Sequence, residues 1–449
     1  MKRLALLFCL FFAISAAYGE VFKDGETVCF FGDSITHGGR FHSIIYDYYL
    51  TRFPERTLRF VNAGVSGDSA GGAQGRLTED ITEKKPTSVA VMFGMNDVNR
   101  GSYVADPDAQ KKAAQQAALD GYRKNMEKLV ARLRGEAGEP RLLFITPSPF
   151  DQTGVNSRTN NQPGCNDGLG KCAEMVRDLA KKNNGTVVDF YGPMTAFNLE
   201  RQKSDPTYTI VGPDRVHPGA PGHLMMAWLF LKAQGAPALV SKVVVDAAKP
   251  GVVESAQAQV SDVATKDGAL TFKVLEKALP FPVDDAAKPI LALLPIERDL
   301  NQETLAVTGL GKGTFELLID GVAVGQYTDE ALAKGVNLAF NEATPQVKQA
   351  KAVAKQDELR RSTESVLRNY AAVRWFLKHR QVNPDDLAAV TTFAATKMGK
   401  TGYYENQVGT YVKNWPQRAQ VVEKVASIER ELLALRTPVA HAYAVRPVR

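Results

Sequence analysis

Short apolar runs alternate with longer amphipathic stretches between residues 20 and 245, and this alternation predicts the fold of that region. The apolar runs are rich in Val, Ile, Leu and Phe and carry little regular polar alternation, which is typical of strands covered on both faces. The expected strands are Thr27–Phe31, Leu58–Asn62, Ser88–Phe93, Arg141–Thr146 and Thr186–Phe190. The expected helices are Phe41–Arg52, Arg76–Lys84, Ala109–Arg134, Leu169–Lys182 and Gly222–Ala233.

Strands that alternate with helices form right-handed βαβ units around a parallel sheet. We therefore expect an α/β domain: a three-layer α/β/α sandwich with a five-stranded parallel sheet, flavodoxin-like in type. Two long polar connections, Ser148–Gly168 and Gly192–Gly219, follow the fourth and fifth strands. Both should overhang the carboxyl edge of the sheet, where folds of this class place their sites.

The pattern changes after Val245, where shorter apolar stretches are broken by Lys, Asp and Gly. We expect a small β-rich appendage over 246–343, with strands at Leu305–Thr308, Gly313–Ile319 and Val322–Tyr327. A helical C-terminal extension is expected over 344–449, with helices at Thr344–His379, Asp385–Lys397 and Pro416–Leu435. Part of this half should pack on the first domain.

The N-terminal residues have the pattern of a secretory signal peptide. Lys2 and Arg3 precede the apolar run Leu4–Ala17, and Ala17-Tyr18-Gly19 fits a small-x-small cleavage site. The sequence thus predicts a signal peptide over 1–19, the α/β domain over 20–245, and export to the periplasm or the medium. An uncleaved anchor is the alternative, although the run is short for a membrane-spanning helix. No later stretch is long and apolar enough to insert stably into a membrane.

Composition adds few constraints. The chain is 44% apolar and 23% charged, as in ordinary globular proteins, and its formal net charge is +6. The positive excess lies mainly in the helical extension, where acidic residues are interspersed, so we expect solvated helix faces and no nucleic-acid partner. His and Cys residues show no metal-ligand spacing, and no cofactor is expected. The oligomeric state stays open.

Three cysteines remain after the expected cleavage: Cys29, Cys165 and Cys172. An odd number argues against a full disulfide framework. A bridge between Cys165 and Cys172 stays open for an exported protein. However, Cys172 shares a helical face with Val176 and Leu179, which favours simple burial.

The candidate chemistry lies at the ends of the first three strands. Ser34 follows the first strand within Gly32-Asp33-Ser34, Gly64 follows the second, and Gly94-Met95-Asn96-Asp97 follows the third. The carboxyl ends of parallel strands meet at one edge, so these residues should converge. A serine nucleophile needs hydrogen-bond donors for a developing oxyanion. The backbone N–H groups of Ser34 and Gly64 and the side-chain amide of Asn96 are the candidate donors.

A fourth stretch, Pro213 to Pro218, supplies the groups that activate a serine. Histidine is the side chain that most often serves as a general base, so His217 is the candidate base for Ser34. Asp214 lies three residues earlier and can accept a hydrogen bond from the other imidazole nitrogen, which fixes the tautomer. Arg215 is a candidate substrate anchor; otherwise it is a solvated or ion-paired surface residue.

These four blocks resemble those of the SGNH hydrolases, also called GDSL-type esterases, in their order and strand placement. The resemblance covers the N-terminal half and implies Ser34 as nucleophile, His217 as base, Asp214 as its orienting carboxylate, and Ser34, Gly64 and Asn96 as the oxyanion hole. The family's leucine after the serine is Ile35 here. The C-terminal half has no counterpart in the minimal family fold.

The sequence therefore predicts a secreted serine hydrolase that cleaves carboxylic esters through an acyl-enzyme. It is similar to the carbohydrate O-acetylesterases, so its partners should be acylated polysaccharides or acylated small molecules. The loop Ser148–Gly168 has few apolar residues, which favours sugar substrates over lipids. The alternatives are a lipase, lysophospholipase or thioesterase acting on longer acyl chains, and a non-catalytic glycan-binding module. The sugar and the acylated position stay open.

Overall fold

The computed structural model describes residues 20–156, 158–266, 268–397 and 403–448. The expected signal peptide, residues 1–19, lies outside them. Five parallel strands form the first sheet in the order β2-β1-β3-β4-β5. They are β1 (Thr27–Gly32), β2 (Arg59–Gly64), β3 (Ser88–Met92), β4 (Arg141–Ile145) and β5 (Thr186–Val188). The expected five-stranded parallel sheet is confirmed, in the strand order of flavodoxin-like folds.

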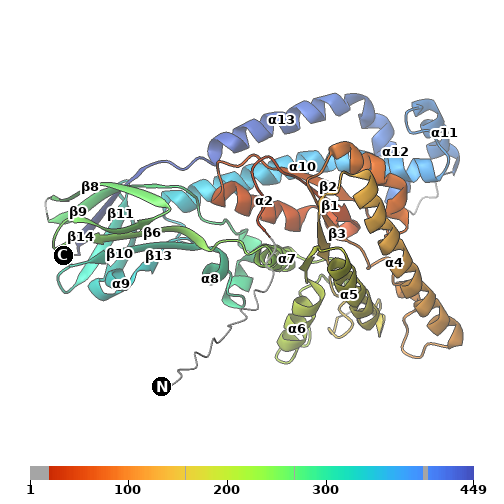
Figure 1. Cartoon of the computed structure of the whole chain (residues 1–449), viewed down its shortest axis with the longest axis horizontal. Coiled ribbons are helices and arrows are strands. Elements are labelled where there is room, and N and C mark those ends of the chain that lie inside the picture. The colour runs from red at the N-terminus through yellow and green to blue at the C-terminus, as the bar shows by residue number, and fades with distance from the viewer. Residues whose placement is uncertain (1–19, 157, 267, 398–402, 449) are drawn as a thin grey trace, which may run out of the picture.

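Helices cover both faces of this sheet (Figure 1). On one face lie α2 (Arg40–Arg52) and α7 (Ala220–Ala233), and on the other lie α4 (Ala109–Glu136) and α5 (Cys165–Lys182). The strand β1 alternates between the two cores: Val28 and Phe30 point to one, Cys29 and Phe31 to the other. This alternation explains why an almost uninterrupted apolar run forms a central strand.

The short elements around the sheet differ in part from those expected. One helix was expected over 76–84, but this stretch is divided among η1 (Gly72–Arg76), α3 (Leu77–Asp80) and η2 (Thr82–Lys84). The expected irregular connection after β5 begins with a helix, α6 (Tyr191–Gln202). The remaining short elements here are α1 (Ser34–His37) and η3 (Arg100–Ser102).

All three cysteines of the described residues are free and buried. Cys165 and Cys172 both belong to α5 and face the core between α5, α4 and the sheet. Burial raises the pKa of Cys29 and of Cys165 to about 12. These thiols are therefore packing residues, and the bridge left open by the sequence is absent.

A lobe with two further sheets follows the first domain. One sheet has the order β13-β10-β6-β7 and the other β12-β11-β14-β9-β8, and the two share one apolar core. The strands are β6 (Leu239–Asp246), β7 (Gly251–Ala256), β8 (Ala258–Lys266), β9 (Ala269–Glu276), β10 (Gln302–Thr308), β11 (Thr314–Ile319), β12 (Val322–Thr328), β13 (Val336–Asn337) and β14 (His441–Pro447). The short helices of this stretch are η4 (Asp285–Ala292), α8 (Ile296–Leu300) and α9 (Asp329–Lys334). The buried residues of η4 and α8 pack in the core of the first domain beside α7, whereas α9 packs in the core of the lobe.

Two strands of this lobe come from outside the range 246–343. The strand β6 lies almost wholly before residue 246 but pairs with β7 and β10, not with the parallel sheet. Residues 441–447 were expected within a helical extension, yet they form β14, which is inserted between β11 and β9. Their alternating burial, with His441, Tyr443 and Val445 inward, fits a strand.

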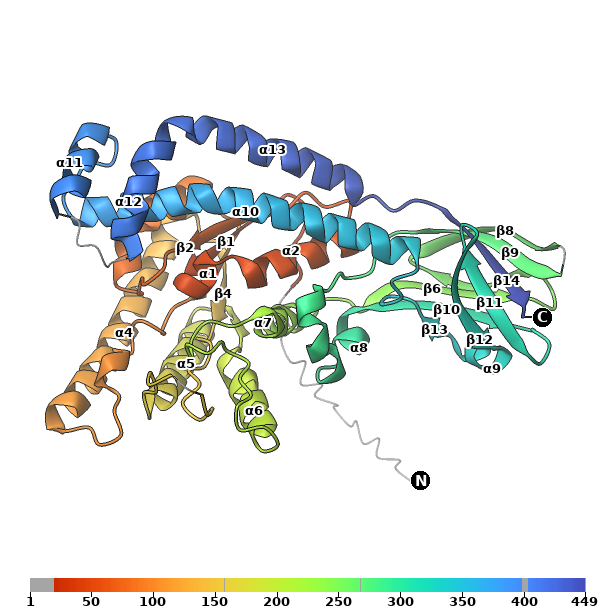
Figure 2. The same ribbon diagram turned by 180° about the vertical axis from the view of Figure 1, so that it is seen from behind.

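The remaining C-terminal residues form helices: α10 (Pro345–His379), α11 (Leu387–Lys397), α12 (Tyr403–Asn414), η5 (Trp415–Gln417) and α13 (Arg418–Leu435). The two long helices α10 and α13 run side by side along one flank of the molecule (Figures 1 and 2). Seen from behind, α10 also lies along α2 of the first domain. The helical extension is thus packed on the first domain mainly through α10, and α13 packs on α10.

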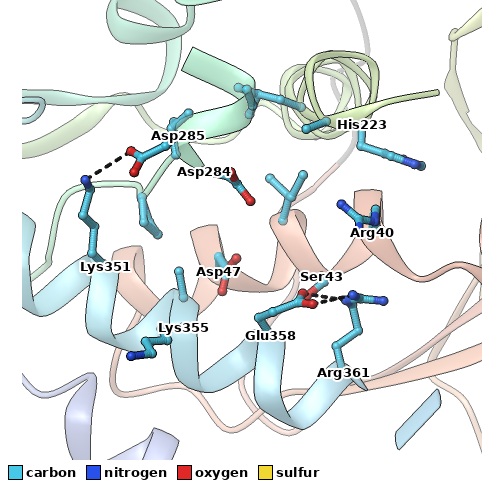
Figure 3. Close-up of a pocket in the computed structure, with 17 residues that line it drawn as sticks. Arg40, Ser43, Asp47, His223, Asp284, Asp285, Lys351, Lys355, Glu358 and Arg361 are labelled. Atoms are coloured by element: carbon cyan, nitrogen blue, oxygen red, sulfur yellow. Dashed lines mark hydrogen bonds and ion pairs between the residues drawn. The ribbon is translucent and has the colours of Figure 1, made fainter. Parts of the chain in front are cut away.

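A cavity of about 350 Å³ lies between α2, α7, η4 and α10 (Figure 3). Lys351 contacts Asp285 and Glu358 contacts Arg361 around it. Ser34, Asp214 and His217 are not among its lining residues. The cavity therefore belongs to the interface between the first domain and α10, not to the serine-containing edge of the sheet.

Candidate active site

Ser34 lies at the carboxyl edge of the parallel sheet, as the first residue of α1. The strand β1 ends at Gly32, and the Oδ1 of Asp33 caps α1 by accepting the N–H of Ile35 at 3.0 Å. Asp33 is 2% exposed, and this burial raises the pKa of its carboxyl to about 6. Asp33 thus fixes the turn, while the half-buried Ser34 hydroxyl faces outward.

The hydroxyl of Ser34 is hydrogen-bonded to His217, with 2.7 Å between Oγ and Nε2. The other imidazole nitrogen, Nδ1, lies 2.5 Å from the Oδ2 of Asp214. The Oδ1 of Asp214 accepts the N–H groups of Val216 and His217. Burial opposes ionisation of Asp214, but these hydrogen bonds from His217 and Val216 lower its pKa. The three residues thus form the relay that a serine nucleophile requires.

A tight turn presents His217. The N–H of Gly212 donates to the carbonyl of His217 at 2.7 Å, and a Cβ at Gly212 would lie 2.6 Å from that oxygen. Only glycine therefore fits this position. The helix α7 begins three residues later, so the imidazole is held between a closed turn and a fixed helix.

Arg215 is neither solvated nor ion-paired at the surface. Its side chain is 4% exposed and donates to the carbonyls of Asp151 and Gly154 and to Oδ1 of Asn160. Its backbone has a φ of 67°, in the left-handed region. The buried side chain therefore braces the loop after β4 and is not presented at the surface as a substrate anchor.

Gly64 is a packing residue, and its N–H is not free for an oxyanion. This N–H donates to the Oδ1 of Asn62 at 2.9 Å. A Cβ on Gly64 would lie 2.1 Å from the backbone nitrogen of His37, so the glycine permits β2 and α1 to approach each other. The sequence alone did not reveal that Asn62 occupies this donor.

Gly67, three residues further along the chain, has what was expected of Gly64: a backbone N–H that is available to a developing oxyanion. Its φ is +78°, it is exposed, and no heavy atom lies within 4 Å of the position of an added Cβ. Within the described residues, the N–H groups of Gly67 and Ser34 have no hydrogen-bond partner. The Nδ2 of Asn96 donates to the carbonyl of Asp68 at 2.9 Å, which ties Asn96 to this turn. Sequence analysis missed Gly67 because two glycines follow the second strand.

A buried network of arginine and aspartate side chains lies beside the turn that carries Gly67. The Arg76 guanidinium binds the carboxylates of Asp68 and Asp80 and also the carbonyls of Gly32 and Ala63, at the ends of β1 and β2. Burial alone would raise the pKa of Asp80, but Arg368 and Arg76 outweigh it and lower the pKa to about 2. This buried network holds together the ends of the two strands that carry the site.

A polar cavity of about 360 Å³ opens beside the relay. It is lined by Asn96, Asn99, Arg100, Gly101, Phe150, Asn160, Gln162 and Asp214. Three of these side chains come from the loop expected over 148–168, which does overhang this edge. Within the described residues, no group of three or more His, Cys, Asp or Glu side chains could hold a metal ion. No helix there is both long and apolar enough to cross a membrane.

Comparison with known proteins agrees with this geometry. Residues 30–225 match the model of the GDSL-like lipase/acylhydrolase family. The structure of BT4096, a gut microbial diltiazem-metabolizing enzyme, superposes with a TM-score of 0.88 at 30% identity, covering 96% of this chain and 99% of that chain. An acetylxylan esterase from Geobacillus stearothermophilus is 27% identical over 226 residues, 47% of this chain and 94% of the relative.

A lipoprotein from Bacillus subtilis, YqeF, is 32% identical over 103 residues, 22% of this chain and 41% of the relative. The similarity to BT4096 extends over the C-terminal half, whereas the acetylxylan esterase matches about half of the chain. The site geometry, the family model and the full-length structural relative agree. The chain belongs to the GDSL-like lipase/acylhydrolase family of serine ester hydrolases.

Proposed function

We propose that the protein is an exported acetylesterase that removes O-acetyl groups from carbohydrates. Ser34 attacks the ester carbonyl while His217 accepts the hydroxyl proton at Nε2, and Asp214 holds the imidazole in the required tautomer. The developing oxyanion accepts hydrogen bonds from the Ser34 and Gly67 N–H groups and the Asn96 amide. His217 then protonates the sugar oxygen as its bond to the acyl carbon breaks, which leaves an acetyl group on Ser34. Water attacks this acetyl group while His217 accepts its proton, and the proton then returns to Ser34 as acetate leaves.

The observation that carries this proposal is the unbroken chain of hydrogen bonds from Ser34 through His217 to Asp214, at 2.7 and 2.5 Å. A lone serine after a strand commonly does no more than cap a helix. Here Asp33 is the cap of α1, so the Ser34 hydroxyl is available to the imidazole.

The polar cavity supports a carbohydrate as the alcohol part of the ester. Side-chain amides of Asn99, Asn160 and Gln162 line it, and such groups hydrogen-bond sugar hydroxyls. Phe150 adds one apolar surface. The relationship to an acetylxylan esterase supports the same substrate class. Export is supported by the signal-peptide pattern of residues 1–19 and by the similarity to a lipoprotein.

A lipase, lysophospholipase or thioesterase would need an apolar groove for a long acyl chain. The amide-rich lining disfavours that alternative. The relationship to a diltiazem-metabolizing enzyme makes small esters a second class to test. A non-catalytic glycan-binding module would not need the relay at hydrogen-bonding distance.

The test compares 4-nitrophenyl esters of increasing acyl length, acetylated xylo-oligosaccharides, acetylated sialic acids and diltiazem as substrates for the full chain. We expect the highest kcat/KM for acetyl esters and release of acetate from at least one acetylated glycan. The variant Ser34→Ala should fold normally and lose all activity. A rate maximum at long acyl chains would replace the proposal with a lipase, and full activity in Ser34→Ala would refute the mechanism.

A further inference from the structure

We propose that Tyr404, in the C-terminal helical extension, is a positioning residue that holds the oxyanion-binding peptide between Ser66 and Gly67 in its active orientation. The inference rests on the proposed function and concerns a part of the chain that lies outside the family match at residues 30–225. It makes the extension part of the catalytic apparatus, not a separate module.

The hydroxyl of Tyr404 donates to the carbonyl oxygen of Ser66 at 2.8 Å. This carbonyl and the Gly67 N–H belong to the same peptide unit. No cis peptide bond occurs in the described residues, so the unit is trans and planar, and its N–H points opposite to its C=O. A hydrogen bond on the carbonyl side therefore fixes the direction in which the N–H points.

The peptide needs such an anchor because glycine follows it. Gly67 has no side chain and tolerates either sign of φ, so rotation of the whole peptide plane costs little. A rotated plane would present the Ser66 carbonyl where the N–H should be. A carbonyl oxygen repels a developing oxyanion, so such a rotation removes one donor and adds an unfavourable dipole.

Further contacts hold the flanking residues. The N–H of Ser66 donates to Nδ1 of His37, and its Oγ also lies 2.9 Å from that nitrogen. Burial lowers the pKa of His37 to about 4, so its imidazole is neutral at pH 7 and can accept. The Arg368 guanidinium, on α10, donates to the carbonyl of Gly64 at 2.8 Å. Residues 64 and 66 are thus both contacted from the extension, through Arg368 and Tyr404.

The extension packs on the first domain through several contacts, and these contacts hold Tyr404 in place relative to the Ser66–Gly67 peptide. Its ring stacks on Phe376 of α10, with 5.3 Å between centroids and 18° between planes. Farther along α10, Arg361 donates to the carbonyl of Gly38, next to α1, and Asp357 accepts the hydroxyl of Ser43. Figure 3 shows Arg361 and Glu358 on this helix turned toward Ser43 and Arg40 of α2.

The test is Tyr404→Phe, which removes the hydroxyl and keeps the ring. Tyr411→Phe is the matched control, because the Tyr411 hydroxyl also donates to a backbone carbonyl, that of Pro384, within the same extension. Each full-length variant is assayed for kcat and KM on 4-nitrophenyl acetate. The rate of Ser34 phosphonylation by a small alkyl fluorophosphonate is measured as well, because that reaction develops an oxyanion without needing turnover.

We expect Tyr404→Phe to lower kcat by about five- to fifty-fold and the phosphonylation rate by a similar factor, with KM within about twofold of the wild type. Tyr411→Phe should leave all three values within about twofold. An unchanged kcat in Tyr404→Phe, or equal losses in the two variants, would overturn the inference. If wild-type protein neither hydrolyses the ester nor reacts with the phosphonate, the proposed function fails instead.

Discussion

The Oγ of Ser34 lies 2.7 Å from the Nε2 of His217, although 183 positions separate the two residues along the chain. Ser34 is placed by the end of β1, and His217 by the closed turn before α7. The hydrogen bond therefore joins two segments that are placed by different elements. Its formation requires the correct assembly of the parallel sheet and α7.

We expect Asp214→Asn to lower kcat on 4-nitrophenyl acetate by about 10³–10⁴-fold while the protein stays folded. An asparagine oxygen can still accept the N–H groups of Val216 and His217, but its NH₂ group, facing Nδ1, favours the wrong imidazole tautomer. Steady-state kinetics and thermal unfolding measure the two effects. A loss smaller than tenfold would show that Asp214 does not orient His217.

Gly64→Ala should destabilise the protein more than Gly67→Ala does. Gly64→Ala inserts a methyl group 2.1 Å from the backbone of His37, so we expect a loss of unfolding free energy of about 3 kcal/mol or more. Gly67→Ala meets no neighbour and carries only the cost of a left-handed backbone, about 1–2 kcal/mol. Urea unfolding of both variants gives the comparison. Equal losses would contradict the assignment of Gly64 as the packing glycine.

Asp97→Asn should make stability less dependent on pH. Burial raises the pKa of Asp97 to about 7, and its Oδ2 is buried without a partner. The folded state therefore binds this proton more tightly than the unfolded state. The charged form thus reduces stability as the pH rises from about 4 through 7, by up to about 1.4 kcal/mol per pH unit.

The amide of Asp97→Asn carries no such charge, so we expect the variant to gain stability relative to the wild type at pH 8 and to gain little at pH 5. Denaturant unfolding at both pH values measures the difference. Asp106→Asn, at an exposed carboxylate, serves as control. A gain that is the same at pH 5 and pH 8 would exclude a buried, proton-binding Asp97.

Removal of β14 should disrupt the β-rich lobe. A chain that ends at Ala440 lacks the strand between β11 and β9, which exposes the lobe's apolar core and leaves two unpaired strand edges. We expect aggregation, or rapid proteolysis within residues 246–343. A chain that ends at Pro447 retains β14 and should behave like the full protein, so equal protease resistance of both would refute a structural role for the strand.

Local patterns in the sequence were sufficient for the parallel sheet. Each strand there is an apolar run between polar turns. The turns mark where each run ends, and the alternation of strands with helices indicates that the strands are parallel. Ser34 lies two residues after β1 and Asn96 four residues after β3, so the strand ends place both at one edge. Asp214 and His217 lie in the turn before α7, and their motif, not a strand end, identified them.

Most of the features that the sequence missed depend on contacts between distant segments, and one depends on a local side-chain contact. Only the structure shows that Asn62 occupies the N–H of Gly64, or that Arg215 turns inward under the loop after β4. Arg368 and Tyr404 lie on helices whose sequence pattern does not distinguish these two residues from their neighbours. The strand β14 is short, and its partners β9 and β11 lie far back along the chain.

The insertion of β14 between β9 and β11 also has a consequence for biosynthesis. Both partner strands leave the ribosome well before residues 441–447 are made, so their facing edges stay unpaired while the helices α10 to α13 are still being translated. The β-rich lobe can therefore close only after nearly the whole chain has been made.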